Sequence, residues 1–393
     1  MKKSNTQKFN LNEIKFSNWK NFQNQEILLS KRNFLLGDMG TGKSNVVDSL
    51  CFIRDIFNKN IGLQHAIDRR GGFNKIKNAN AKDEESIQIS IKFTDFDNNK
   101  WSYSLGVNLN DDDIKTACIT SETIKKNNVN IYHKKLDKNK IDEVEKTKPA
   151  ALDENINSEF RAIFDFFQSF KFLNVSPHVT KNRNLIDSNI QGLDIYNEDF
   201  INNIKTTNKT NRNKRLKKLN TMLKKTGIFD RFSKRTKIAF SVCESNFGHI
   251  ELIAKTKDDE FKINESQMSS GQLQLLSILW FLTGDETLLI FEEPEKHLNE
   301  RIIEDIPNIF LDVIEENGKQ ITSITNSFSM LVDLDIEYSE CILFEKGKND
   351  TKIKNCDDIK KIKQHKKSDK SIAHAILENS KSASKNNENN TGR

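Results

Sequence analysis

The sequence predicts an α/β fold in which a mixed central sheet carries an antiparallel β-subdomain and a helical insertion. Two short apolar runs, Asn33–Leu36 and Leu288–Phe291, read as buried strands, because strands covered on both faces lack polar alternation. Residues 87–93 and 101–109 do alternate, which is typical of an antiparallel hairpin with one face on a core. Helical spacing over Asn45–Phe57 follows the first run directly, so strand and helix alternate as in α/β proteins.

The remaining elements are expected from local pattern in chain order. Short strands are predicted at Glu13–Phe16 and Glu26–Leu29, and again within 114–135. The spacing of phenylalanines over 160–170 predicts an amphipathic helix. We expect the last strand at 341–347.

Composition excludes several classes of protein. Among 393 residues no apolar stretch of 18 occurs and the N-terminus has no apolar signal core, so we expect a cytoplasmic protein without a membrane partner. The five cysteines form no C-x-x-C pair, which argues against a zinc site. The net charge of +6 indicates little by itself, because the chain is rich in Lys, Asn and Ile throughout.

A phosphate-binding loop is predicted between the first buried run and its helix. The pattern G-x-x-x-x-G-K-[ST] is complete, and the residues expected to contact nucleotide are Gly37, Asp38, Met39, Gly40, Thr41, Gly42, Lys43, Ser44 and Asn45. Glycines let backbone N–H groups approach phosphate oxygens, and the helix N-terminus attracts the anion. Lys43 supplies charge for the outer phosphates and Ser44 a hydroxyl for Mg²⁺. A chance glycine-rich turn is the alternative, but the strand–loop–helix setting disfavours it.

Carboxylates follow the second buried run. Glu292 and Glu293 stand at its C-terminal end, where open α/β sheets place ligands. One carboxylate can hold Mg²⁺ with Ser44, and its neighbour can orient or deprotonate an attacking water. Two further motifs flank this run: Ser269-Ser270-Gly271-Gln272 before an apolar helix, and Thr325-Asn326-Ser327 after another short strand.

The order of these motifs resembles the ABC-type ATPase head of the SMC/RecF/OLD superfamily, and most closely the small stand-alone RecF-like ATPases. The resemblance covers roughly residues 9–347 and includes an R-R-G-G-F turn after the P-loop helix. It implies a P-loop NTPase of the ABC-ATPase type. By this resemblance residues 37–44 are Walker A, and residues 269–272 are the signature. Glu292 then takes the metal position of Walker B, Glu293 the catalytic position, and Asn299 falls in the D-loop region.

In this superfamily the signature of one subunit caps the ATP held by the other. The resemblance therefore implies ATP and Mg²⁺ as cofactors and a homodimer that sandwiches ATP. Two positions depart from the usual pattern. Glu292 replaces the usual Asp, and Asn326 replaces the usual switch His. Because Asn cannot carry a proton, we expect slow turnover, although Asn326 as a simple strand-end cap is an alternative.

The resemblance also predicts the domain organisation. Residues 1–377 form the head, with an N-terminal lobe (9–135), a helical insertion (136–237) and a lobe with signature, Walker B and switch (238–347). We expect residues 378–393 to be a disordered tail. Neither heptads nor a C-x-x-C hook occur between Walker A and the signature, and fewer than 50 residues follow 347. A nuclease domain like that of OLD proteins is thus not expected, and a separate effector protein, such as a nuclease, is.

The insertion is most basic over residues 205–237, with thirteen Lys and Arg against one acid. This segment predicts either a DNA or RNA backbone contact or a solvated helix face, and the second interpretation is favoured. Three functions remain open. The first is an ATP-driven sensor or regulator of an effector in bacterial anti-phage defence. The second is a RecF-like DNA-repair ATPase, and the third a slowly hydrolysing scaffold.

Overall fold

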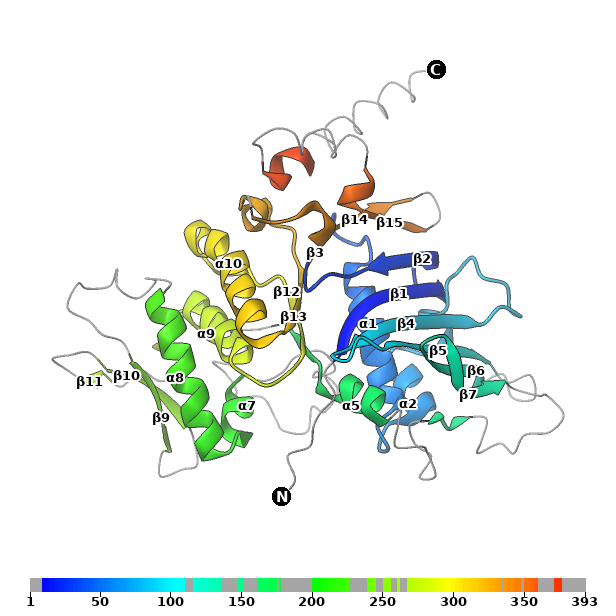
Figure 1. Cartoon of the computed structure of the whole chain (residues 1–393), viewed down its shortest axis with the longest axis horizontal. Coiled ribbons are helices and arrows are strands. Elements are labelled where there is room, and N and C mark those ends of the chain that lie inside the picture. The colour runs from blue at the N-terminus through cyan, green and yellow to red at the C-terminus, as the bar shows by residue number, and fades with distance from the viewer. Residues whose placement is uncertain are drawn as a thin grey trace, which may run out of the picture.

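The fold was analysed in a computed structural model of the chain (Figure 1). The structure describes residues 9–109, 116–135, 147–150, 161–174, 177, 200–225, 239–244, 250–255, 260–261, 267–333, 335–347, 350–359 and 371–376. The predicted tail at 378–393 lies outside these residues, as does most of the charged stretch 136–156, which the sequence predicts to be a surface loop.

The central sheet has six strands in the order β15-β14-β3-β13-β12-β8. Its strands are β3 (Arg32–Gly37), β8 (Lys171–Leu173), β12 (Leu288–Glu292), β13 (Gln320–Ile324), β14 (Cys341–Lys346) and β15 (Thr351–Asn355). All pair in parallel except β15, which is antiparallel to β14. The carboxyl ends of β3, β13, β12 and β8 therefore meet at one edge of the sheet.

Both faces of this sheet are buried, as its apolar runs predict. On β3, Phe34 and Leu36 face one hydrophobic core, while Leu35 faces the other. On β12, Leu289 and Phe291 point to the same core as Phe34, and their neighbours point to the opposite one. Successive side chains of these strands therefore point to opposite faces. The sequence shows no apolar–polar alternation, because both faces are covered by apolar residues.

The antiparallel β-subdomain covers one side. Its six strands have the order β2-β1-β4-β5-β6-β7. They are β1 (Phe9–Trp19), β2 (Phe22–Leu28), β4 (Ile87–Asp95), β5 (Lys100–Leu109), β6 (Ala117–Lys126) and β7 (Val129–Lys135). The predicted hairpin is β4–β5, and its buried face packs in one core with α1, which lies between this subdomain and the central sheet (Figure 1). A separate three-stranded sheet contains β9 (Ala239–Glu244), β10 (Ile250–Lys255) and β11 (Glu260–Phe261).

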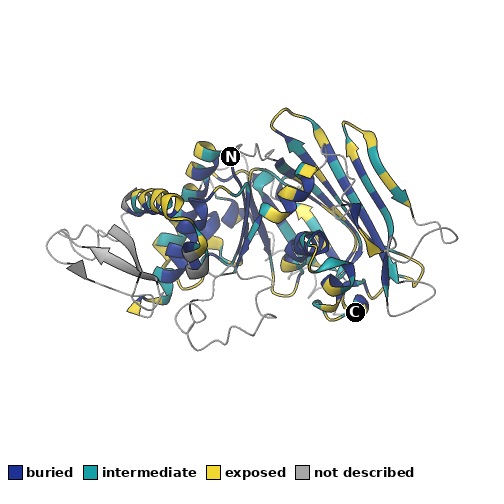
Figure 2. Cartoon of the chain, turned by 90° about the horizontal axis from the view of Figure 1, so that it is seen from below, coloured by how far each residue is buried: buried dark blue, intermediate teal, exposed yellow. Residues whose placement is uncertain are grey.

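Helices complete the two cores. They are α1 (Lys43–Ile56), α2 (Gly62–Asp68), α3 (Phe73–Ile76), α5 (Arg161–Ser169), α7 (Phe200–Thr206), α8 (Lys209–Lys225), α9 (Ser270–Leu282) and α10 (Glu300–Asn317). Residues of α1, α2 and α5 share a core with the β-subdomain, whereas α7 to α10 cover the other face of the central sheet. Figure 2 shows the buried residues gathered where helices meet the sheets. No helix in the described part of the chain is long and hydrophobic enough to cross a lipid bilayer.

Some predicted boundaries were wrong. The strands expected at Glu13–Phe16 and Glu26–Leu29 are longer, because β1 continues through a register shift between Leu11 and Glu13 that interrupts its alternation. The strand at 341–347 is not the last one. β15 follows it as an edge strand, and its largely polar sequence hid it from pattern reading.

Candidate functional site

The P-loop connects β3 to α1, as predicted, and a side chain at either of two of its glycines would meet neighbouring atoms. A Cβ at Gly37 would lie 2.4 Å from the Phe344 carbonyl oxygen, and one at Gly42 would lie 2.1 Å from the Asn21 side-chain amide. Both glycines also have positive φ. Asn21 supports the loop from the β1–β2 turn by donating to the Thr41 carbonyl at 3.0 Å. The loop is therefore shaped by strands on both sides and not by the motif alone.

Lys43 begins α1 and lies within the curve of the loop. Its Nζ donates to the carbonyl oxygens of Gly37 at 2.5 Å and Asp38 at 2.8 Å. Burial lowers the pKa of the Lys43 amine, while the nearby carboxylates, Asp38 foremost, act in the opposite direction. The Lys43 amine therefore places a positive charge against the first two residues of the loop.

The end of β12 meets the start of α1. Ser44 Oγ donates to Glu292 Oε1, and Asn174 Nδ2 donates to the other oxygen of Glu292 at 2.9 Å. Asn174 follows β8, which pairs in parallel with β12. A hydroxyl and a carboxylate are oxygen donors of the kind that Mg²⁺ prefers. Among the described residues there is no cluster of three or more His, Cys, Asp or Glu that could hold a metal ion.

Glu293 follows Glu292 directly, and its backbone conformation differs from that of the strand. Its φ of 48° is left-handed, and its N–H donates to the Ile324 carbonyl at 2.7 Å. Asn326, after β13, donates from Nδ2 to Glu293 Oε1 at 3.1 Å, and Lys296 forms an ion pair with Glu293 Oε2. The predicted pair of Glu293 and Asn326 is thus in direct contact, at the same sheet edge as the P-loop.

A third carboxylate belongs to this cluster. Glu295 Oε1 accepts from Thr325 Oγ1 at 2.7 Å and from the Asn326 backbone N–H at 3.1 Å. Burial raises the pKa of the Glu295 carboxyl, and the charge of Glu293 adds to the effect. Sequence reasoning missed Glu295, Lys296 and Asn174. The repeated acids of E-E-P-E were a signal for Glu295, whereas no local signal marks Asn174.

The predicted signature forms the start of α9. Ser269 is the N-cap, and it shares a reciprocal capping box with Gln272: Ser269 Oγ accepts at 3.1 Å, and the Gln272 side chain accepts from the Ser269 N–H at 2.8 Å. A Cβ at Gly271 would lie 2.5 Å from the His297 carbonyl oxygen, so this helix start packs on the turn after Walker B. Among the described residues, no hydrogen bond or ion pair joins residues 269–272 to the P-loop.

The basic segment is helical where the structure describes it. Leu216, Leu219 and Leu223 of α8 are buried. Arg215 stacks over the Trp280 ring at 4.0 Å and donates to the Trp280 carbonyl at 2.9 Å, so it serves the core. The exposed cations of this helix include Lys214, Lys217 and Lys218.

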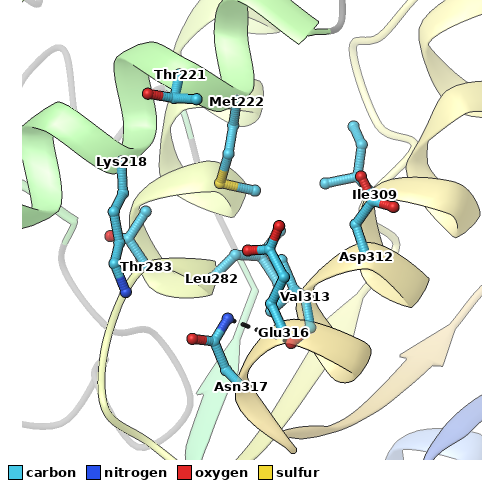
Figure 3. Close-up of a pocket in the computed structure, with 10 residues that line it drawn as sticks. All are labelled: Lys218, Thr221, Met222, Leu282, Thr283, Ile309, Asp312, Val313, Glu316 and Asn317. Carbon is cyan, nitrogen blue, oxygen red and sulfur yellow. Dashed lines mark hydrogen bonds between the residues drawn. The ribbon is translucent and has the colours of Figure 1, made fainter.

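A pocket of about 170 Å³ lies between α8, α9 and α10 (Figure 3). Leu282 and Thr283, at the carboxyl end of α9, contribute to its lining, together with Lys218 of α8 and Glu316 of α10. Because α9 has 13 residues and rises about 1.5 Å per residue, the pocket is roughly 20 Å from the signature. None of its lining residues belongs to the P-loop, the signature or the β12 carboxylates.

Comparison with known proteins is consistent with this geometry. Residues 32–322 match the family model described as "AAA domain, putative AbiEii toxin, Type IV TA system". The fold is similar to a solved SMC head bound to the C-winged helix domain of ScpA, with 14% identity, a TM-score of 0.51, and 88% of this chain and 97% of that chain covered. It is also similar to the SMC head domain from Thermotoga maritima, with 12% identity, a TM-score of 0.49, and 88% and 98% covered. No curated protein sequence matched.

These matches confirm the predicted fold class and the resemblance to ABC-type heads of the SMC/RecF superfamily. At such low identity the structural likeness shows the fold alone.

Proposed function

The chain belongs to the AAA-domain family whose description reads "putative AbiEii toxin, Type IV TA system". We propose that it hydrolyses ATP with Mg²⁺, as a homodimer that regulates a separate effector. The observation that carries the proposal is the contact of four motif residues at one sheet edge. Ser44 meets Glu292, and Glu293 meets Asn326, beside the P-loop. Charge stabilisation and water orientation at the γ-phosphate need these groups together.

Each residue has a distinct role in the proposed reaction. Lys43 and the loop N–H groups bind the outer phosphates. Ser44 and Glu292 would hold Mg²⁺, which supplies charge neutralisation when bound. Glu293 orients the attacking water and accepts its proton. Asn326 orients Glu293 by donating a hydrogen bond, but its amide cannot take up or release a proton during the reaction, so slow turnover follows from this assignment.

The proposed dimer is supported by the position of the signature. Its helix start provides an exposed Ser269 and the positive end of α9, an arrangement suited to a phosphate. This arrangement supports a nucleotide held by a second copy of the chain as its ligand. In the proposed dimer Asn299 would also lie at the contact between the two copies. It is the N-cap of α10 and follows the turn that approaches Gly271.

Regulation of an effector in anti-phage defence is the biological role we infer. The family description names a type IV TA system, and this supports the inference that the chain acts together with a partner protein. A DNA-binding function is the second candidate. It is favoured by the exposed lysines of α8, although Arg215 of that helix is occupied by the core.

Two measurements on purified protein test the proposal. Lys43→Ala should abolish or severely weaken ATP binding in a calorimetric titration, because it removes the charge that meets the outer phosphates. Glu293→Gln should retain ATP binding but cut phosphate release by at least ~10²-fold, since it keeps the shape and loses the base. Unchanged turnover in Glu293→Gln would move the scaffold hypothesis to the front.

A further inference from the structure

Glu295 has no part in the proposed chemistry, yet it joins two of the elements that carry it. Its Oε1 accepts one hydrogen bond from the Thr325 hydroxyl at 2.7 Å and one from the Asn326 N–H at 3.1 Å. Glu295 belongs to the turn after β12, and both donors follow β13 directly. A single carboxylate oxygen therefore fixes the end of β13 against the turn that bears Glu293.

Backbone hydrogen bonds also fix the two segments that Glu295 joins, the end of β13 and the turn after β12. Thr325 is fully buried, and its N–H donates to the Leu35 carbonyl of β3 at 3.2 Å. Glu293 keeps a left-handed φ of 48°, uncommon outside glycine, with its N–H on the Ile324 carbonyl. Strand β3 and the turn after β12 are thus both bonded to the end of β13, where Thr325 and Asn326 donate to Glu295.

Asn326 lies between the two carboxylates. Its backbone N–H meets Glu295, whereas its side-chain Nδ2 meets Glu293 Oε1 at 3.1 Å. The direction of the Asn326 amide consequently depends on where Glu295 holds the backbone. We propose that Glu295 is a positioning residue, which holds Asn326 so that its amide orients Glu293 for the attack of water. This inference rests on the proposed function, and Glu295 itself does not touch nucleotide.

The electrostatics explain why the contact is strong enough for this role. Glu295 Oε2 is buried and has no hydrogen-bond partner among the described residues. The stabilisation of the carboxylate therefore comes mainly through Oε1. A buried charge that loses such charge-assisted bonds incurs a large desolvation cost, so the turn and the strand end move together.

If Glu295 had only a structural role, its loss should lower stability or ATP binding. The test therefore measures ATP binding and turnover separately. We would measure ATP affinity by calorimetry and turnover by phosphate release in Glu295→Ala, Asn326→Ala and the double variant. The expected loss of turnover in Glu295→Ala is at least ~10-fold, because small misplacement of a catalytic group is costly. The ATP dissociation constant should remain within about 2-fold, because Glu295 forms no hydrogen bond or ion pair with the P-loop among the described residues and its charge is the weakest of the nearby carboxylate influences on Lys43.

The double variant decides whether Glu295 acts through Asn326. In the Asn326→Ala background, Glu295→Ala should lower turnover by no more than about 2-fold further, as expected for coupled residues. Equal losses in both backgrounds, or a loss of ATP affinity, would overturn the inference. If Glu295→Ala does not fold, Thr325→Val replaces it, with Thr325→Ser as the matched control that keeps the hydroxyl. Turnover should then fall in Thr325→Val alone, and equal rates would refute the role.

The proposed function can fail separately. A parent protein that binds ATP but releases no phosphate would refute the proposed hydrolysis and this inference with it. A parent that hydrolyses ATP, with Glu295→Ala at the parental rate, would refute only the inference.

Discussion

Glu122 of β6 offers the sharpest test of the packing in the β-subdomain. It is fully buried, and its carboxylate accepts from the Tyr103 hydroxyl at 2.9 Å and from the Ala150 N–H at 2.8 Å. Burial raises the pKa of the Glu122 carboxyl from 4.5 to about 7, because it outweighs these two hydrogen bonds and the charge of Lys134. The folded protein therefore binds this proton more tightly than the unfolded chain does.

The sign and size of the pH effect follow from this difference. As pH rises from 4.5 to about 7, the unfolded chain releases the proton first, so the free energy of unfolding falls. A difference of roughly 2.5 pKa units corresponds to about 3 kcal/mol of stability lost above pH 7. Glu122→Gln mimics the protonated acid, since its amide can donate to the Tyr103 oxygen and its carbonyl can accept from Ala150.

Thermal or urea unfolding between pH 5 and pH 8.5 would measure this effect. We expect Glu122→Gln to match the parent at acid pH and to exceed its stability increasingly toward pH 8, by up to about 3 kcal/mol. Glu315→Gln, at an exposed position of α10, is the control and should show no such trend. A stability difference between Glu122→Gln and the parent that does not change with pH would refute the reasoning.

Three further predictions concern the proposed function. Ser269→Arg places a bulky side chain where the γ-phosphate of a partner's ATP would dock. Light scattering with ATP and Mg²⁺ should then show no nucleotide-driven dimer, while ATP binding persists. Association equal to that of the parent would disprove the cross-subunit geometry. Joint replacement of Lys214, Lys217 and Lys218 by Gln should flatten the salt dependence of DNA affinity by about three units of log–log slope if α8 contacts DNA, and an unchanged slope would favour a solvated face. Asn326→His should raise phosphate release or leave it unchanged, and a fall would show that Asn is required in its own right.

Much of the fold could be predicted from the sequence wherever a motif lies within one strand and the turn that follows it. The P-loop and the β12 carboxylates are encoded within single strand–turn units, so their places could be read directly. Asn174 could not be found this way, because only the parallel pairing of β8 with β12 brings it to Glu292. β8 has three residues and no pattern of its own.

Glu295 illustrates a second limit. Glu295 stands visibly in the E-E-P-E run, but its hydrogen-bond donors, Thr325 and Asn326, follow only from the register of β13 beside β12 and β3. Register depends on contacts between segments far apart in the chain, which local periodicity does not encode. For the same reason the sequence did not distinguish Arg215 from the other cations of its segment, although in the structure it stacks on Trp280.

The close approach of Gly271 to the His297 carbonyl has a consequence for communication between sites. In the proposed dimer, the signature senses the nucleotide of the neighbouring subunit, while the turn before His297 bears Glu293, which acts on the subunit's own nucleotide. Because the backbone of one segment leaves no room for a side chain on the other, we expect displacement of one to shift the other. Occupancy of one site would therefore alter the rate at the second, and turnover should depend on ATP concentration with a Hill coefficient different from one.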